Sequence, residues 1–565
     1  MTVEQYHDGS KHHFHRFAAS LGYLDWASQP NPFRSFGAPA IPLPRGPDGV
    51  AGVPPVSPSG VTYDRLFQPA VDPAPISASG IGDVLRHALG LSAWKRFRDA
   101  RPSTSSGRRE LVERRWALRV NPSSGNLHPT EAYVVAGPLA GLGDTPAVYH
   151  YAPDRHALEL RCRFDADAWL AACGSPSAGW LVALASIHWR EAWKYGERAF
   201  RYCQHDLGHA IAAVRLAAGL AGWRASILPH WSQQAIAAMA GIDRDDDFVD
   251  AEREEPACVM AVTAGAPPSS LGDGRALADA IQRGRWSGRA SQLSEDHVEW
   301  TSIDEIARAT EDSGRPPSRE APADRRNLGG ERHAVPIVEA VTNWPDRGLD
   351  ARRLILQRRS ALAFDGTSAT TTGAFMTMLS RVMPGACPPW DALWWTACVH
   401  LVLFVHRVEG LASGLYFLVR DPDALPRIKA ACGREFLWER IAGALPLFLL
   451  ATGDCRSLAR RLSCDQDIAA DGFFSLGMLA ELDASLREHG PSFYRHLFWE
   501  SGFVGQILYL EAEAAGARAT GIGCFYDDPV HDVLSLEGHA FQSLYHFTVG
   551  APVEDNRLTT EPPYV

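Results

Sequence analysis

The stretch FRYCQHDLGHAIAAVRLAAGLAGWRA, residues 200–225, aligns without a gap with YRHLFWESGFVGQILYLEAEAAGARA, residues 494–519. Both stretches are rich in apolar residues on nearly every face, which is typical of a buried helix. They lie 294 positions apart (494 − 200 = 294) in a chain of 565 residues, a period far too long for a solenoid repeat. The sequence therefore predicts two copies of one domain, each with a long buried helix, at 200–222 and at 494–516.

Composition shifts along the chain predict four segments. We expect an N-terminal arm over 1–60, a first copy over 61–265, a linker over 266–333 and a second copy over 334–565. Each copy mixes strands and helices, so the predicted fold class is α+β with a central sheet. The two buried helices are expected to pack on each other, as in a homodimer fused into one chain. The predicted helices are at 79–89 and 372–381, and the predicted strands at 131–136, 257–263, 401–405 and 544–550.

The overall composition excludes several classes of protein. The chain is 46% hydrophobic and 21% charged, which is ordinary for a globular protein. A net charge of −11 argues against a nucleic-acid partner. Ten cysteines without a CxxC pair argue against a zinc ribbon or a disulfide framework, and His12, His13 and His15 lack further ligands at metal-binding spacing. No apolar run is long enough for a membrane span, so we expect a soluble cytoplasmic protein with no metal and no membrane partner.

Arg358, Arg359 and Ser360 stand together near the start of the second copy. Two guanidinium groups and a hydroxyl suit a phosphate, which they can hold by charge-assisted hydrogen bonds. A solvated basic turn explains the same three residues, so this motif alone leaves both interpretations open.

The phrase NPSSGNLHP, residues 121–129, comes just before the predicted strand of the first copy. Small residues let backbone N–H groups approach a planar ligand, and serine and asparagine supply donors and acceptors. An ordinary turn between two elements is the alternative. The candidate binding residues of this phrase are Pro122, Ser123, Ser124, Gly125 and Asn126.

The phrase GIGCF, residues 521–525, follows the buried helix of the second copy. Gly521 and Gly523, on either side of Ile522, permit a close approach of the backbone to a ligand. A turn at the C-terminus of the helix explains the two glycines equally well.

Together, and in this order, the three motifs resemble the FMN-dependent nitroreductase superfamily. WKYGERAFRY, residues 193–202, is similar to the KYGxRxYR stretch of its SagB-type branch, the azoline (thiazoline and oxazoline) dehydrogenases of modified-peptide biosynthesis. YHDGSKHHFHRF, residues 6–17, and LDWASQPNPFR, residues 24–34, resemble the N-terminal region of long two-copy members. The resemblance covers most of the chain outside the linker.

This resemblance implies a mainly antiparallel sheet flanked by helices in each copy and a flavin that is shared between two subunits. In the family, the basic motif and the GxG turn come from one subunit and the Pro-Ser-Ser loop comes from the other. The resemblance also implies catalytic roles for Lys194 and Tyr195. The base that removes a proton from the substrate would be a lysine whose pKa is lowered by burial, or a tyrosine activated beside a cation. Arg557 is a candidate phosphate ligand or a solvated tail arginine, and Gln506 faces either the flavin edge or the partner helix.

The two copies have lost different parts of this site. The offset between the helices places residues 64–66, Asp-Arg-Leu, opposite 358–360, and residues 226–228, Ser-Ile-Leu, opposite 520–522. Alignment of the strands at 132 and 401 places the tryptophan-rich residues 390–398 opposite 121–129. We therefore expect one FMN per chain in one intact site, and a second site filled by Trp390, Trp394 and Trp395.

The function that the resemblance favours is oxidation of an azoline-like substrate, a small molecule or a peptide, by hydride transfer to FMN. An NAD(P)H-dependent nitro or quinone reductase is the first alternative, since the family binds the nicotinamide over the flavin without a GxGxxG fingerprint. A non-catalytic flavin-binding partner in a biosynthetic complex is the second, because part of the repeat has decayed. The substrate, the electron donor or acceptor, and whether the pseudo-dimer is monomeric are left open.

Overall fold

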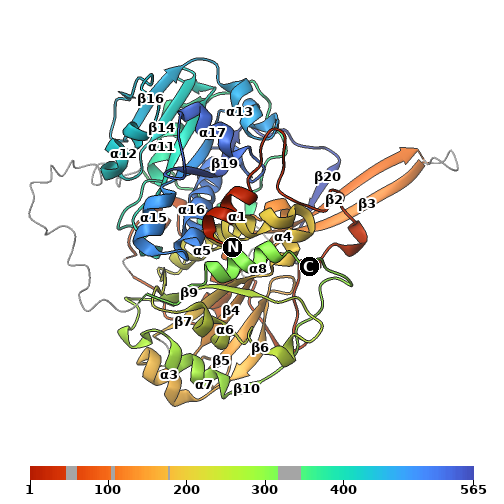
Figure 1. The fold of residues 1–565 in the computed structure, drawn as a ribbon. Coiled ribbons are helices and arrows are strands. Elements are labelled where there is room, and N and C mark those ends of the chain that lie inside the picture. Colours follow the sequence, from red (N-terminus) through yellow and green to blue (C-terminus); the bar gives the residue numbers. More distant parts are fainter. Residues whose placement is uncertain (46–59, 71, 103–108, 176–177, 316–344, 565) are drawn as a thin grey trace, which may run out of the picture.

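The computed structural model describes residues 1–45, 60–70, 72–102, 109–175, 178–315 and 345–564. Two β-sheets form two lobes, and the long helices α5 (Ala199–Gly219) and α16 (Phe493–Ala514) lie between them (Figure 1). Both helices are buried along nearly their whole length, as the apolar sequence predicts. The two buried helices predicted at 200–222 and 494–516 are thus confirmed, and they pack against each other.

The two sheets share one strand order. Reading from the edge inward, β18-β19-β17-β12-β14-β16 in the second sheet corresponds to β8-β9-β7-β4-β5-β6 in the first, and the pairs are antiparallel. The predicted α+β class with antiparallel sheets is confirmed. The first sheet contains β1 (Ala40–Pro42), β4 (Thr130–Ala136), β5 (Ala147–Ala152), β6 (Ala157–Arg163), β7 (Gly179–Ser186), β8 (Arg224–Ile227), β9 (Glu255–Thr263) and β10 (Arg285–Trp286); the second contains β12 (Val399–Val405), β14 (Gly414–Leu418), β15 (Glu439–Arg440), β16 (Leu447–Thr452), β17 (Phe474–Ala480), β18 (Arg518–Ile522) and β19 (Gln542–Gly550).

Equivalent helices begin at equivalent positions in the two lobes. α2 (Ala78–Ala88) and α11 (Thr372–Arg381) begin at positions that the alignment of the buried helices also pairs. Each has a hydroxyl at its N-cap: Ser77 accepts a hydrogen bond from the backbone N–H of Gly80, and Thr371 accepts one from that of Ala374. The first residues of β4 and β12 are likewise paired by the alignment that places 390–398 opposite 121–129.

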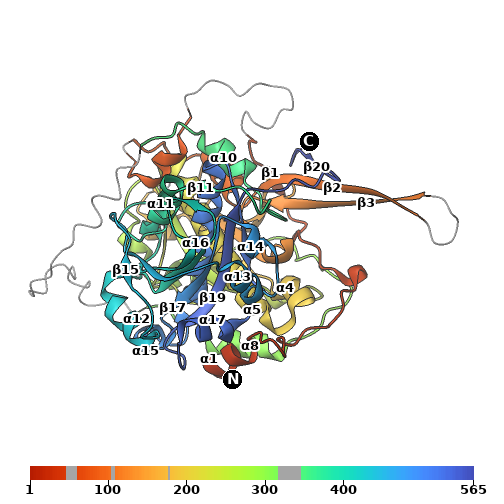
Figure 2. The same ribbon diagram turned by 90° about the horizontal axis from the view of Figure 1, so that it is seen from above.

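A long β-hairpin, absent from the sequence predictions, projects from the body of the molecule (Figures 1 and 2). It consists of β2 (Leu91–Pro102) and β3 (Arg109–Arg119), and its base is joined by the C-terminal strand β20 (Leu558–Glu561). Trp94 lies opposite Glu561 in this pairing. The end of the chain is thereby tied to a segment that precedes the first lobe's central strands.

The N-terminal arm contains a helix that sequence periodicity missed. α1 (Val3–Gly9) has a capping box between Thr2 and Gln5. His7 hydrogen-bonds Tyr494 at 3.0 Å and Gln542 at 2.8 Å, so α1 is fixed to the second lobe, whereas β1 pairs with β6 of the first. The arm therefore spans both lobes.

Other sequence predictions concern the end of the N-terminal arm and the linker between the two copies. The prolines at 54, 55 and 58, near the predicted end of the arm, and residues 316–333 of the predicted linker lie outside the described residues. The earlier part of that linker contains α7 (Arg275–Gln282) and α8 (Thr301–Ala309). Across the described ranges, no helix has both the length and the apolar character that crossing a bilayer requires.

Candidate functional site

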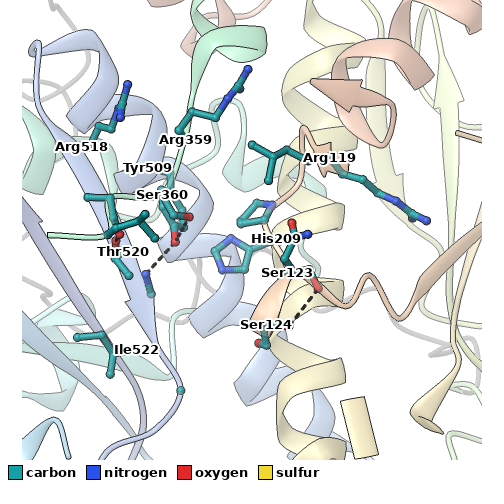
Figure 3. Close-up of a pocket in the computed structure, with 18 of the residues that line it drawn as sticks. Arg119, Ser123, Ser124, His209, Arg359, Ser360, Tyr509, Arg518, Thr520 and Ile522 are labelled. Carbon is teal, nitrogen blue, oxygen red and sulfur yellow. Dashed lines mark hydrogen bonds between the residues drawn. The ribbon is translucent and has the colours of Figure 1, made fainter. Parts of the chain in front are cut away.

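A cavity of about 470 Å³ lies where the two lobes, the base of the hairpin and helix α5 meet (Figure 3). Its volume is within the range of small-molecule and cofactor sites. The lining residues near the first lobe are Lys95, Trp116, Leu118, Arg119, Asn121, Pro122, Ser123, Ser124, Gly125, Asn126, His128, Tyr195, Tyr202, Asp206 and His209; those near the second lobe include Arg358, Arg359, Ser360, Gln466, Tyr509, Arg518, Thr520, Gly521, Ile522, Gly523, Cys524 and Tyr545. The three sequence motifs therefore line one cavity.

Arg358 is a buried cation with little to neutralise it. Arg358 directly follows helix α10 (Ala351–Gln357) in the chain. The residue is 4% exposed, and this burial lowers the pKa of its guanidinium. One guanidinium N–H donates to the carbonyl of Arg119 at 3.3 Å, but Nε and Nη1 are buried without a hydrogen-bond partner. Within the described parts of the chain, no carboxylate lies at ion-pair distance from Arg358. A buried, unpaired guanidinium on a cavity wall is the expected signature of a site for an anion.

Other polar groups accompany Arg358 on the second-lobe side of the cavity. Ser360 donates to the phenol of Tyr509 at 3.1 Å, and that phenol accepts from the backbone N–H of Gly521 at 2.8 Å. Arg359 donates to backbone carbonyls, among them that of Leu356 at 2.8 Å, and Arg518 pairs with Glu554 at 2.6 Å. In Figure 3, Arg359 and Arg518 lie at one end of the cavity and Ile522 and Ser124 at the other.

The loop 121–128 forms the opposite wall. Gly125, Asn126 and His128 all have positive φ values, of 60°, 61° and 55°. Asn126 holds this conformation by donating to the carbonyl of Ala117 at 2.9 Å, and Ser123 accepts from the backbone N–H of His128 at 2.8 Å. The serine and asparagine side chains therefore secure the conformation of the loop itself.

The loop is anchored to helix α5 by a buried carboxyl group that sequence reasoning missed. Asp206 lines the cavity and accepts from the backbone N–H of Ser124 at 3.1 Å and from its hydroxyl at 3.1 Å. Burial raises the pKa of Asp206 to about 7 despite these hydrogen bonds. Burial and the neighbouring Asp206 also raise the pKa of Glu191. The available signal in the sequence is the polar run QHD within an otherwise apolar helix.

Tyr195 lines the cavity, whereas Lys194 is not among the lining residues and lies beside Gly125 of the loop. The Lys194 ammonium lies 5.0 Å from the centre of the Tyr195 ring, and both groups contact Gly125: a β-carbon there would lie 2.6 Å from the Tyr195 hydroxyl and 3.1 Å from the Lys194 nitrogen. Burial, followed by the charge of Glu191, raises the pKa of Tyr195 well above its ordinary value. A raised pKa favours the protonated phenol, so it does not support the expected role of Tyr195 as a base activated by its neighbouring cation.

Of the two expectations for the glycines of the GIG phrase, the structure contradicts the helix C-terminal turn, and both glycines line the cavity. Gly521 belongs to strand β18 and Gly523 directly follows it, so a turn at a helix C-terminus does not explain them. A β-carbon on Gly521 would collide with the hydroxyl of Tyr545, and one on Gly523 would collide with the ring of Tyr202. The glycines leave room for two aromatic side chains of the cavity wall.

Two further candidates lie outside the cavity lining. Gln506 is 1% exposed and interacts with His209, which does line the cavity and whose pKa burial lowers to about 3. Arg557 is exposed and pairs with Asp555 at 2.8 Å, although Asp555 itself reaches the cavity. Gln506 thus reaches the cavity only through the imidazole of His209, and Arg557 does not line it.

Aromatic side chains pack in part of the corresponding location in the other half of the molecule, and a second cavity of about 600 Å³, lined by Arg65, Leu66 and Arg215 among others, lies in the same half. The alignment of the buried helices pairs Phe503 with His209 and His496 with Tyr202, and both His209 and Tyr202 line the cavity. The Trp390 ring lies 4.9 Å from that of Phe503, and the Trp395 ring lies 4.9 Å from that of His496, with Trp394 beside it.

The residue that corresponds to Arg358 there is Asp64. It accepts hydrogen bonds from Arg347, at 2.8 Å, and from Arg381. A buried carboxylate that is already paired with two arginines is a poor partner for an anion, so this half lacks the charge that marks the cavity.

Comparisons with known proteins bear on the fold. No protein-family model and no curated protein matches the chain. Among solved structures, the chain is similar to a "putative nitroreductase" from Anabaena variabilis ATCC 29413, with a TM-score of 0.65 and 19% identity over 97% of this chain and 99% of that one. Two others are the Escherichia coli microcin synthetase McbBCD complex with truncated pro-MccB17 bound (TM-score 0.28, 15% identity, 47% of this chain and 85% of that one) and the NADPH:FMN oxidoreductase from Vibrio harveyi complexed with NAD⁺ (TM-score 0.22, 14% identity, 36% and 68%).

The last two TM-scores are too low to carry an argument. The first likeness extends over both lobes, because it covers nearly all of each chain. The chain therefore has a nitroreductase-like fold across its full two-lobed architecture.

Proposed function

We propose that this protein is an FMN-dependent oxidoreductase in which two nitroreductase-like units of one chain form a pseudo-dimer around a single flavin. The observation that carries the proposal is the cavity between the lobes, with the unpaired guanidinium of Arg358 on one side and the loop 121–128 on the other. The matching strand orders and the aligned starts of α2 and α11 support descent of the units from one domain.

The cavity fits a flavin mononucleotide chemically. Arg358 supplies unsatisfied N–H donors for a phosphate, with Ser360 and Arg518 nearby. The carboxamide oxygen of Asn121 and the Nδ1 atom of His128 are also buried without partners on the opposite wall, where polar ring atoms of a ligand would satisfy them. FMN would supply two-electron chemistry, in which its ring accepts a hydride from the substrate.

The protein's own contribution to such a reaction is proton transfer. A dehydrogenation that removes a hydride from one atom requires loss of a proton from the neighbouring atom. Asp206, with a pKa of about 7, can hold or release a proton on its carboxyl oxygens near neutral pH, and Tyr195 can donate a hydrogen bond as a phenol. His209 is neutral and shares a hydrogen bond of 3.2 Å with Tyr545.

Within this class, we propose a SagB-type dehydrogenase that oxidises an azoline-like small molecule or peptide. The WKYGERAFRY stretch supports this choice, since Tyr195 lies on the cavity wall and Lys194 lies beside both Tyr195 and Gly125. Electron transfer from NAD(P)H to a nitro or quinone compound, and flavin binding without catalysis, are the competing functions.

The stoichiometry of bound flavin tests the architecture. The full chain is loaded with FMN, freed of excess, and the flavin absorbance is compared with the protein concentration. We expect about one FMN per chain, because in the other half Asp64 stands at the position of Arg358 and Trp390 lies in the segment that replaces the loop 121–129. Two FMN per chain would contradict the filled second site, and none would contradict the proposed function.

The reductant distinguishes the competing functions. Under anaerobic conditions, the FMN-loaded protein is mixed in a stopped-flow instrument with a model thiazoline peptide or with NAD(P)H. Bleaching of the flavin by the thiazoline peptide supports the dehydrogenase. Bleaching by NAD(P)H alone favours the reductase, and the absence of any response favours a non-catalytic role.

A further inference from the structure

Two cysteines from distant parts of the second lobe meet at the wall of the cavity. Cys464 follows helix α13 (Arg456–Leu462), and Cys524 follows strand β18. Their sulfur atoms are 2.9 Å apart and share a hydrogen bond, and Cys524 lines the cavity. Both thiols are free and only partly buried. Local sequence spacing excludes a CxxC pair, but it cannot detect two cysteines that only the fold brings together.

The backbone around both cysteines holds them together. Cys464 and Asp465 have positive φ values of 53° and 56°, a conformation that non-glycine residues adopt infrequently. The side-chain amide of Gln466 then donates to the carbonyl of Ser463 at 2.7 Å and to that of Cys524 at 3.0 Å. The contact between the two sulfurs is therefore built into the loop between α13 and the following helix.

The surroundings favour the thiolate form of Cys524. The hydrogen bond with Cys464 lowers the pKa of Cys524, burial opposes this, and a hydrogen bond with His12 of the N-terminal arm lowers it further. His12 accepts from the backbone N–H of Ala18 at its Nδ1 atom, at 3.0 Å, so its Nε2 atom carries the proton that it donates. The cation of Arg198, which donates to the carbonyl of Gly523 at 3.3 Å, acts in the same direction.

We propose that Cys464 and Cys524 are a redox-active dithiol that closes to a disulfide at the wall of the flavin cavity. Starting from the Cys524 thiolate and the Cys464 thiol, the step forms one S–S bond, breaks one S–H bond and releases two electrons and one proton, which would pass to oxidised flavin as the acceptor. In the opposite direction, the disulfide would open with two electrons and one proton from the anionic reduced flavin. The inference rests on the proposed function for the identity of this acceptor.

The geometry suits such a pair. A disulfide requires sulfurs about 2.05 Å apart, so the two side chains need to close by only about 0.9 Å from their separation of 2.9 Å. Redox-active cysteines typically combine an accessible, electropositive environment with a lowered pKa and an adjacent resolving thiol. Cys524 meets the first two conditions and Cys464 supplies the third.

The first experiment needs no flavin. The full chain is equilibrated with oxidised or with reduced glutathione, free thiols are trapped with N-ethylmaleimide, and peptides are analysed by mass spectrometry. We expect a linked Cys464–Cys524 peptide after the oxidised treatment only. If both cysteines are alkylated after either treatment, the proposal is overturned.

The second experiment counts electrons. The oxidised protein is loaded with FMN and titrated anaerobically with dithionite, while free thiols are counted at each point. The wild type should take up about four electrons per chain, two for the flavin and two for the disulfide, and Cys464→Ser about two. Cys455→Ser is the matched control, because Cys455 is a partly buried thiol that does not line the cavity, and it should take up about four electrons.

The outcomes separate the two claims. A wild-type protein that binds FMN but takes up about two electrons overturns the dithiol and leaves the proposed function intact. A protein that binds no FMN overturns both the proposed function and the flavin as acceptor, and the glutathione experiment then decides whether the cysteines are redox-active at all.

Discussion

Gly208 of α5 packs directly against Gly502 of α16. A β-carbon on Gly502 would lie 3.0 Å from the Cα atom of Gly208 and would collide with the carbonyl oxygen of His205. A β-carbon on Gly208 would collide with the carbonyl oxygen of Trp499. These two glycines are partners in the alignment of the two copies. The helices therefore touch at equivalent positions of the repeat. Close contact there sets how α5, with Asp206 and His209, faces the second lobe.

Replacement of Gly502 with alanine should destabilise the protein by about 1–3 kcal/mol, because the added methyl group meets backbone atoms that cannot move aside. The free energy of unfolding, measured with urea, gives the comparison. Gly373→Ala on α11 is a matched control, since its nearest neighbour, the Thr371 hydroxyl, is 3.9 Å away. The control should leave stability unchanged or raise it. Equal stabilities for both variants would contradict the close crossing.

Arg358→Met should weaken FMN binding by about 10- to 100-fold, the effect of losing a charge-assisted hydrogen bond to phosphate. Binding of riboflavin, which lacks the phosphate, should change little. Fluorescence titration of both ligands measures the two affinities. Because burial already disfavours the Arg358 cation, the ligand-free variant should be at least as stable as the wild type.

Arg557→Met is the control for this prediction. Arg557 is exposed and pairs with Asp555, so its replacement should leave the affinity for FMN unchanged. If Arg557→Met weakens FMN binding and Arg358→Met does not, the phosphate site has been placed at the wrong arginine.

Much of the fold could be predicted because the duplication repeats the same sequence pattern in both halves of the chain. A buried helix is apolar all round, and the gap-free alignment of two such helices identified α5 and α16, whereas the short strands β8 and β18 that follow them were not predicted. The three motifs that line the cavity were found because small or basic residues cluster at single points in the chain.

Other features could not be read from local patterns. The hairpin β2–β3, much of which projects from the body (Figure 1), carries few alternating apolar residues, so strand periodicity does not reveal it. The GIG glycines have their role from Tyr202 and Tyr545, which come from other elements of the fold. The pKa of Asp206 and the contact between Cys464 and Cys524 depend on burial and on tertiary proximity, which no spacing rule encodes.

The buried carboxyl group of Asp206 should make stability depend on pH. Its pKa in the folded state is about 7, above the value of an unfolded aspartate, so the folded state binds more protons between about pH 4 and pH 7. The contribution of Asp206 to stability should therefore fall as pH rises through this window, by at most about 4 kcal/mol, and the difference between the wild-type and Asp206→Asn profiles should show this fall. Urea unfolding of the ligand-free protein from pH 4 to pH 8 measures it.

Asp279→Asn, at an exposed position of α7, is the control for this dependence and should follow the wild type. A wild-type profile parallel to that of Asp206→Asn would show that Asp206 is ionised in the folded protein at all these pH values.

Tyr195 and Lys194 should differ in what their loss does to the protein. Tyr195 lines the cavity as a phenol, so Tyr195→Phe should lower the rate of thiazoline oxidation by about 100-fold with FMN binding retained. Lys194 packs beside Gly125 and near the Tyr195 ring, so Lys194→Ala should act through the position of that ring and lower the rate less, by about tenfold. Single-turnover bleaching of the flavin measures both rates. A Lys194→Ala variant with bound FMN and full turnover would remove Lys194 from the reaction, and the same result for Tyr195→Phe would leave Asp206 as the proton carrier on this wall.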